Sequence, residues 1–253
     1  MKLQIETYQK RLPSAGTQIT FRPILVKEEK LYIMSKESEK PEDFFQSLVQ
    51  IVSNCTIEPK DFNVPKMSYN DFIFTFLELR KISKGEYVYL DLFCSNPKCK
   101  DEIENEGVKS NTPHCERGTK YNLNEIIKLQ NDNIKRPKII KINDTLGIEM
   151  NPTSVKYIQE ISQADFKISE SLLKYHNIEK HLVAVLKGEE REVISRPEDA
   201  TEFVESLSEK QIEEITKWIN LEPRCILEID WKCSKCGQDN KIRSIDLLRF
   251  LEW

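Results

Sequence analysis

Two cysteine pairs far apart in the chain place the strongest constraint on its fold. Cys233 and Cys236 lie in the segment W-K-C-S-K-C-G, which begins at Trp231, and Cys94 and Cys99 lie in C-S-N-P-K-C. Both spacings, C-x-x-C and C-x4-C, fall within the range typical of zinc ligands. A tetrahedral zinc ion takes four such ligands, so a shared ion would hold residues 94 and 233 close together. The sequence therefore predicts a zinc site built from two distant segments.

The sequence leaves open which second cysteine of the first segment binds the metal together with Cys94. Cys94 pairs either with Cys99 in a short knuckle, or with Cys115 of H-C-E-R-G across an inserted polar loop. An all-cysteine shell leaves no open position for water, which predicts a structural rather than a catalytic metal. A redox role is disfavoured because the second pair precedes a polar turn, not a helix that would lower a thiol pKa. The candidate metal ligands are Cys94, Cys99, Cys115, Cys233 and Cys236, with His114 as a less favoured substitute.

The remaining cysteines and histidines are expected to be structural. Cys55 and Cys225 are in phase with apolar neighbours on a predicted helix and strand, as buried free cysteines usually are. His176 and His181 are five residues apart on one predicted helix, a spacing that does not place them on the same face. We expect both histidines to be exposed or to be satisfied by local hydrogen bonds.

Composition, charge and the absence of common motifs argue against several classes of protein. Lys and Arg number 38 against 42 Asp and Glu, and this net charge of -4 argues against a dedicated nucleic-acid-binding protein. The first residues carry no signal-peptide pattern, and no window approaches the roughly 18 apolar residues of a membrane span, so we expect a cytoplasmic protein with reduced thiols. The common nucleotide-binding, hydrolase and metalloprotease motifs do not occur. These observations favour a non-enzymatic protein without a small-molecule substrate.

Hydrophobic periodicity predicts an α+β fold, mainly helical, with short antiparallel strands. Two strand-end cysteine knuckles are expected to form a zinc-ribbon-like site. We expect two domains: an N-terminal α+β unit, 1–130, with the first knuckle, and a mainly helical unit, 131–253, with the second knuckle and a closing helix. Residues 95–120 and 188–200 are expected to be polar connections. The predicted helices are 27–35, 41–55, 67–84, 154–161, 169–186, 209–219 and one after Ser244 that includes Leu251; the predicted strands are 87–94, 138–142, 146–150 and 225–231.

Several longer segments resemble one known family. They are L-P-S-A-G-T-Q-I-T-F-R-P-I-L-V-K-E-E-K-L at 12–31, F-L-E-L-R-K-I-S-K-G-E-Y-V-Y-L at 76–90, N-D-T-L-G-I-E-M at 143–150, and the C-terminal C-x-x-C-G. Together they resemble the T-even-type bacteriophage baseplate protein family, the hub assembly proteins of contractile-tailed phages, over essentially the whole chain. The resemblance implies a cysteine at each strand end, matching Cys94 and Cys233. An inserted loop would favour Cys115 over Cys99, so the fourth ligand remains undecided.

The resemblance implies a structural or assembly role in a phage tail. The chain would be a hub component or a hub assembly chaperone, present in the host cytoplasm during assembly and in the virion tail baseplate. Its partners would be other baseplate and hub subunits, with an oligomer inside the baseplate allowed. Trp253 is our candidate for a contact outside the chain. The alternative is a zinc-ribbon nucleic-acid-binding adaptor that uses the basic stretch Lys128 to Lys141.

Overall fold

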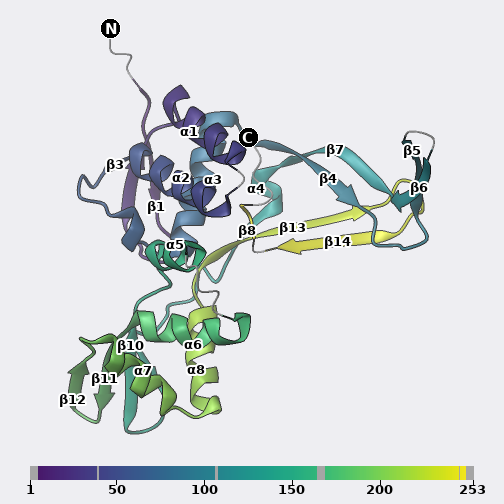
Figure 1. Cartoon of the computed structure of the whole chain (residues 1–253). Coiled ribbons are helices and arrows are strands. Elements are labelled where there is room, and N and C mark those ends of the chain that lie inside the picture. The colour runs from purple at the N-terminus through teal and green to yellow at the C-terminus, as the bar shows by residue number, and fades with distance from the viewer. Residues whose placement is uncertain (1–4, 39, 106–107, 164–168, 245, 249–253) are drawn as a thin grey trace. The chain divides into compact units, whose positions relative to one another are not determined.

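The computed structural model describes residues 5–38, 40–105, 108–163, 169–244 and 246–248 (Figure 1). Its residues group into two compact units, each made of two separate stretches of chain. The first unit contains Met1–Leu79 and Asn131–Arg224, and the second contains Arg80–Gln130 and Cys225–Trp253. The chain passes between the units three times, and one passage lies in the middle of a helix.

The first stretch of the first unit combines a small sheet with helices. Strands β1 (Tyr8–Arg11), β2 (Gln18–Phe21) and β3 (Thr56–Glu58) form an antiparallel sheet in that order. Helices α1 (Val26–Glu37), α2 (Pro41–Cys55) and α3 (Tyr69–Lys84) follow, with a short 3-10 helix, η1 (Val64–Lys66), before α3. Apolar side chains at helical spacing on α2 and α3 are buried because one face of each helix packs into the core. The rings of Phe45 and Phe72, for example, meet edge to face with centroids 5.6 Å apart.

One conspicuous segment near the N-terminus, F-R-P-I-L-V-K-E-E-K, forms a buried ion pair. Nη2 of Arg22 lies 3.0 Å from Oε1 of Glu28, whose side chain is fully buried. The guanidinium also donates to the carbonyl of Asn54, and the backbone N–H of Leu25 donates to Glu28. These bonds join the end of β2, the start of α1 and the end of α2. The segment therefore has a structural role.

The second stretch of the first unit forms a four-stranded antiparallel sheet with helices beside it. The sheet order is β12 (Glu190–Val193), β11 (Leu182–Lys187), β10 (Leu146–Met150) and β9 (Ile139–Lys141). The helices are α5 (Val155–Gln163), α6 (Glu170–His181), α7 (Pro197–Glu205) and α8 (Glu209–Asn220). Residues from the sheet and from α6, α7 and α8 share one apolar cluster that includes Ile148, Ile178, Ile215 and Trp218.

The second unit consists mostly of strands. It contains β4 (Tyr87–Phe93), β5 (Lys100–Asn105), β6 (Val108–Pro113), β7 (Cys115–Asn122), β8 (Ile127–Gln130), β13 (Arg224–Lys232) and β14 (Asp239–Ser244). Its described helical residues are the end of α3, from Arg80 to Lys84, and one short helix, α4 (Leu123–Ile126). The strands form three sheets with the orders β14-β13-β8, β4-β7 and β5-β6. Figure 1 shows the β5–β6 hairpin beside the turn between β13 and β14.

The predicted fold class is wrong in two respects. The residues that the structure describes are 40% helical and 31% strand, so the fold is mixed rather than mainly helical. Most of residues 95–114, in the segment expected as a polar connection, form β5 and β6, because cross-strand backbone pairing does not need an apolar pattern. The two cysteine pairs lie near each other, but the described residues do not show the expected zinc ribbon.

Two further segments differ from the prediction. The helix predicted over 169–186 ends at His181, and L-V-A-V-L-K continues as β11, which pairs with β10 and β12. The predicted loop 188–200 contains β12 and the start of α7. The closing helix after Ser244 is not formed at residues 246–248, and its other residues, with Trp253, lie outside the described residues.

Other local predictions are confirmed. Helix α2 has the predicted bounds, and α8 begins with the predicted capping box between Ser208 and Gln211. Gly85 follows α3 with φ +87°, the left-handed conformation expected for a glycine after a helix. The division into folding domains 1–130 and 131–253 stays a prediction, although residue 130 is one of the points where the chain passes between units.

Candidate metal centre and a buried polar cluster

The first cysteine knuckle is built at the end of β4. The backbone N–H of Cys94 donates to the carbonyl of His114, and the N–H of His114 donates to the carbonyl of Cys99, both at 2.9 Å. These two bonds bring Cys94 and Cys99 together across the base of a tight loop. Within that loop the N–H of Cys99 donates to the carbonyl of Asn96, and Oδ1 of Asn96 accepts the N–H of Lys98.

The second knuckle is the turn between β13 and β14. The N–H of Cys233 donates to the carbonyl of Gln238, and the N–H of Gly237 donates to the carbonyl of Cys233, both at 2.9 Å. Gly237 has φ +73°, a conformation that costs a side-chain-bearing residue about 1–2 kcal/mol. The glycine of C-x-x-C-G is therefore required by the shape of the turn.

The two knuckles bring four sulfur atoms together. Ligand atoms of Cys94, Cys99, Cys233 and Cys236 all lie within 4.8 Å of one another. The Sγ atoms of Cys94 and Cys236 are 3.6 Å apart, and those of Cys99 and Cys233 are 3.8 Å apart. Sulfurs at about 2.3 Å from a tetrahedral ion are about 3.8 Å from each other, whereas a disulfide bond is about 2.05 Å long. The cluster thus fits a metal ion and contains four free thiols.

The cysteines of the cluster differ in thiol pKa because their surroundings differ. Burial raises the pKa of Cys94, and raises that of Cys99 to about 12. The pKa of Cys236 is lowered to about 6, first because the backbone N–H of Gln238 donates to its sulfur. A bound cation would deprotonate all four thiols, since a metal-bound thiol gives up its proton. The partly buried Trp231 packs against Cys94, Cys99 and Cys233, whereas Cys236 is exposed.

Cys115 does not join this cluster. It begins β7, is partly exposed, and is not among the residues whose ligand atoms converge with Cys94. Of the two geometries that the sequence left open, the one that pairs Cys94 with Cys99 is present. Cys55 and Cys225 are buried core residues, as predicted.

Polar contacts tie the two knuckles together beyond the sulfurs. Oδ1 of Asn240 accepts hydrogen bonds from both the N–H and the hydroxyl of Ser95, at 2.8 and 2.7 Å. The N–H of Ser234 donates to Oε1 of Glu116 at 2.7 Å. Nζ of Lys235 lies 2.8 Å from Oδ1 of Asp101, and this lysine together with His114 lowers the pKa of Asp101 to about 2. The centre is held by protein contacts as well as by its ligands.

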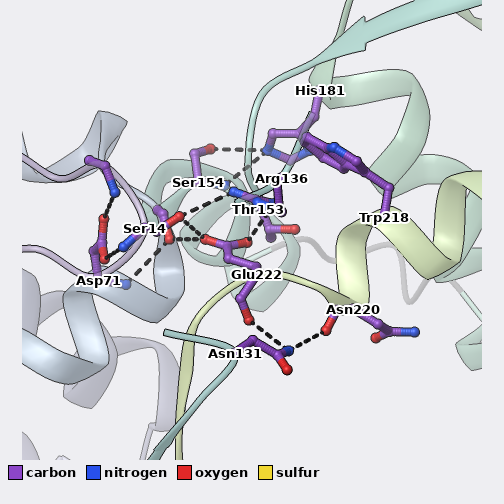
Figure 2. Close-up of polar contacts among 12 residues, drawn as sticks. Ser14, Asp71, Asn131, Arg136, Thr153, Ser154, His181, Trp218, Asn220 and Glu222 are labelled. Carbon is purple, nitrogen blue, oxygen red and sulfur yellow. Dashed lines mark hydrogen bonds and ion pairs between the residues drawn. The ribbon is translucent and has the colours of Figure 1, made fainter. Parts of the chain in front are cut away.

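A second cluster of polar side chains, in the first unit, escaped the sequence analysis. This buried polar cluster consists of Ser14, Ser68, Asp71, Arg136 and Glu222 (Figure 2). Glu222 accepts from the hydroxyls of Ser14 and Ser68, and Arg136 lies beside it with Nη1 3.7 Å from Oε2. Asp71 accepts the backbone N–H groups of Ser14 and Ala15 at 2.7 and 3.0 Å.

The cluster gives the turn L-P-S-A-G near the N-terminus a physical role. Its serine hydroxyl and two successive N–H groups are the groups that Glu222 and Asp71 accept from. Arg136 also stacks on Trp218, 4.4 Å from the ring centroid, so it is not available to bind phosphate as part of the basic stretch 128–141. The turn was the only signal in the sequence, because isolated carboxylates such as Glu222 have no periodicity.

Histidine contacts near this cluster are structural. Nε2 of His181 accepts the backbone N–H of Ser154 at 3.0 Å, and Nδ1 lies 2.8 Å from the carbonyl of Asn177 (Figure 2). Both ring nitrogens therefore have hydrogen-bond partners, and the hydroxyl of Ser154 also lies 3.3 Å from Nε2. Burial lowers the pKa of His181, which keeps the ring neutral. Nδ1 of His176 lies 3.1 Å from the hydroxyl of Tyr157.

One comparison assigns the chain to a class of phage structural proteins. The family model described as T4 bacteriophage base plate protein matches residues 5–252. The chain belongs to this family of bacteriophage baseplate proteins, which links it to the tail baseplate and to other baseplate components. Comparisons with curated proteins and with solved structures gave no match. Among the described residues, no helix is long and apolar enough to cross a membrane.

Proposed function

We propose that this protein is a non-enzymatic component or assembly chaperone of the baseplate hub. The match to the baseplate family over residues 5–252 carries this proposal. The protein would bind other hub subunits in the host cytoplasm during assembly.

We also propose that Cys94, Cys99, Cys233 and Cys236 hold one structural zinc ion. The sulfur separations of 3.6 and 3.8 Å support it, because they are close to the edge of a tetrahedral zinc–thiolate site. Zinc bound there would supply a fixed cross-link. The ligands come from the turn after β4 and the turn after β13, so binding would add directly to the folding free energy of the second unit.

Cross-linking mass spectrometry of purified tails tests the proposed place in the hub. Lysines of this chain should be cross-linked to subunits on the central axis of the baseplate. If the chain is a chaperone, the same cross-links should appear in assembly intermediates and be missing from finished tails. Cross-links only to peripheral baseplate subunits in both samples would contradict a hub role.

Elemental analysis with native thiol counting tests the metal. We expect zinc in the purified protein and no more than three reactive thiols, because four of the seven cysteines are bound. Cys94→Ser and Cys233→Ser should lose the zinc, whereas Cys55→Ala, a buried cysteine of the first unit, should keep it. A wild-type protein with no metal and seven reactive thiols would disprove the zinc site.

A further inference from the structure

His114 is a partly buried histidine that the fold and the four-cysteine cluster leave unexplained. Its Nδ1 lies 2.8 and 2.9 Å from the two carboxylate oxygens of Asp101. Its Nε2 is buried and has no hydrogen-bond partner among the described residues. Leaving a buried polar atom unpaired costs about 1–3 kcal/mol, so such an atom calls for an explanation.

The pairing with Asp101 determines what Nε2 can do. A carboxylate only accepts, so Nδ1 carries the proton that it donates to Asp101, and in the neutral ring Nε2 then has a lone pair. A histidine that donates one N–H to a carboxylate and turns the other nitrogen inward is the usual arrangement of a metal-ligating histidine. Asp101 itself is held by Lys235 and by the backbone N–H of Cys115, which fixes the imidazole ring.

Two further ligand atoms converge on His114. A ring nitrogen of His114, a carboxylate oxygen of Glu116 and Sγ of Cys233 all lie within 4.8 Å of one another. Glu116 already accepts the N–H of Ser234, but a carboxylate has two oxygens and can keep that bond while it binds a cation. Nitrogen, oxygen and sulfur from these residue types are all ligands that zinc takes.

We propose that His114, Glu116 and Cys233 form a second zinc position, which shares the Cys233 sulfur with the four-cysteine ion. This inference rests on the proposed zinc site and extends it to a two-metal centre. Charge favours the second cation: four thiolates, Glu116 and a single divalent ion leave a net charge of about −3, and a second divalent ion reduces it to about −1. Three protein ligands leave one position for water, so the second ion is the more weakly held of the two.

The test is a zinc titration of the full chain, stripped of metal and followed by native mass spectrometry. We expect the wild type to bind two zinc ions at saturation. His114→Asn, whose amide can still donate to Asp101, and Glu116→Gln should each bind one. The matched variants His176→Asn and Glu125→Gln, at residues outside both groups of ligands, should bind two. Asp101→Asn should weaken the second ion about 10–100-fold, as loss of an orienting carboxylate does.

The outcomes separate this inference from the site on which it rests. One zinc in the wild type, or two in His114→Asn, would overturn the second position and leave the four-cysteine site standing. No zinc in the wild type would overturn both. Cobalt substitution gives an independent readout, because the thiolate-to-cobalt absorption of the second equivalent should be missing in His114→Asn if the proposal holds.

Discussion

Glu222 accepts a 2.9 Å hydrogen bond from Oγ of Ser14, across 208 positions of sequence. The bond joins the turn between β1 and β2 to the chain just after α8. Ser68, at the start of α3, donates to the same carboxylate, and Arg136 pairs with it. One buried carboxylate therefore closes the first unit, whose two stretches of chain are separated by residues 80–130.

Removal of this carboxylate should destabilise the protein strongly. Glu222→Ala leaves Arg136 without its ion-pair partner, and loss of one partner of a buried pair typically costs about 3–5 kcal/mol. The measurement is urea unfolding at pH 7 with zinc present. Glu214→Ala removes an exposed partner of Lys217 on α8 and should cost less than about 1 kcal/mol. Equal losses in the two variants would show that the buried polar cluster does not close the unit.

Asp71 should make the protein more stable in mild acid. Burial is the main cause that raises its pKa from 3.8 to about 6, so between these values the folded state binds more protons than the unfolded state. Asp71 therefore contributes up to about 3 kcal/mol to the free energy of unfolding. This contribution is complete below pH 3.8 and is lost as the pH rises through 6.

Comparison with Asp71→Asn isolates this contribution, since the amide is uncharged throughout. Unfolding free energies of both proteins are measured between pH 4.5 and pH 7.5, at about one-unit intervals. The wild-type value minus the Asp71→Asn value should decrease as the pH rises. The exposed Asp61→Asn should differ from the wild type by a constant amount. A constant difference for Asp71→Asn as well would mean that Asp71 is ionised across the whole range.

Serine substitutions at Cys99 and Cys115 should separate the two candidate ligand sets. Cys99→Ser removes a sulfur of the cluster, so bound zinc should fall and the cooperative melt should be lost or shifted down. Cys115→Ser should keep the four-cysteine zinc and melt within about 2–4 °C of the wild type. Metal analysis and thermal melts of both variants check this. Zinc loss in Cys115→Ser alone would favour the ligand set with the inserted loop.

Gly237→Ala should weaken the metal centre by straining its turn. Its φ of +73° predicts a cost of about 1–2 kcal/mol for a side chain, and the turn positions Cys233 and Cys236. Gly188→Ala carries a similar strain at φ +63° in the turn between β11 and β12, away from the cysteines. Competition with a chelator should show weaker zinc binding only in Gly237→Ala. Equal zinc affinity in both variants would refute a role for this turn in metal binding.

The sequence predicted an element correctly where local pattern determines it, and wrongly where pairing with distant residues does. Helix α2 was predicted at its bounds because its apolar face repeats at helical spacing and Pro41 starts it. Residues 182–187 were predicted as helix, since an apolar run of that length fits either structure. Their pairing with β10, more than 30 residues away, decides for a strand. Strands β5 and β6 have no apolar alternation because they pair only with each other.

By itself, the sequence determined the residue types and the local turns of the site. The spacing C-x-x-C-G requires the turn at Gly237, and the five candidate cysteines were read directly from the chain. The tertiary structure decided which cysteines meet, because the bond between His114 and Cys99 directs Cys115 into β7 instead of the cluster. It also decided that Ser14, Asp71 and Glu222 share one buried cluster. A long-range contact between single polar residues leaves no periodic trace, so only the folded chain shows it.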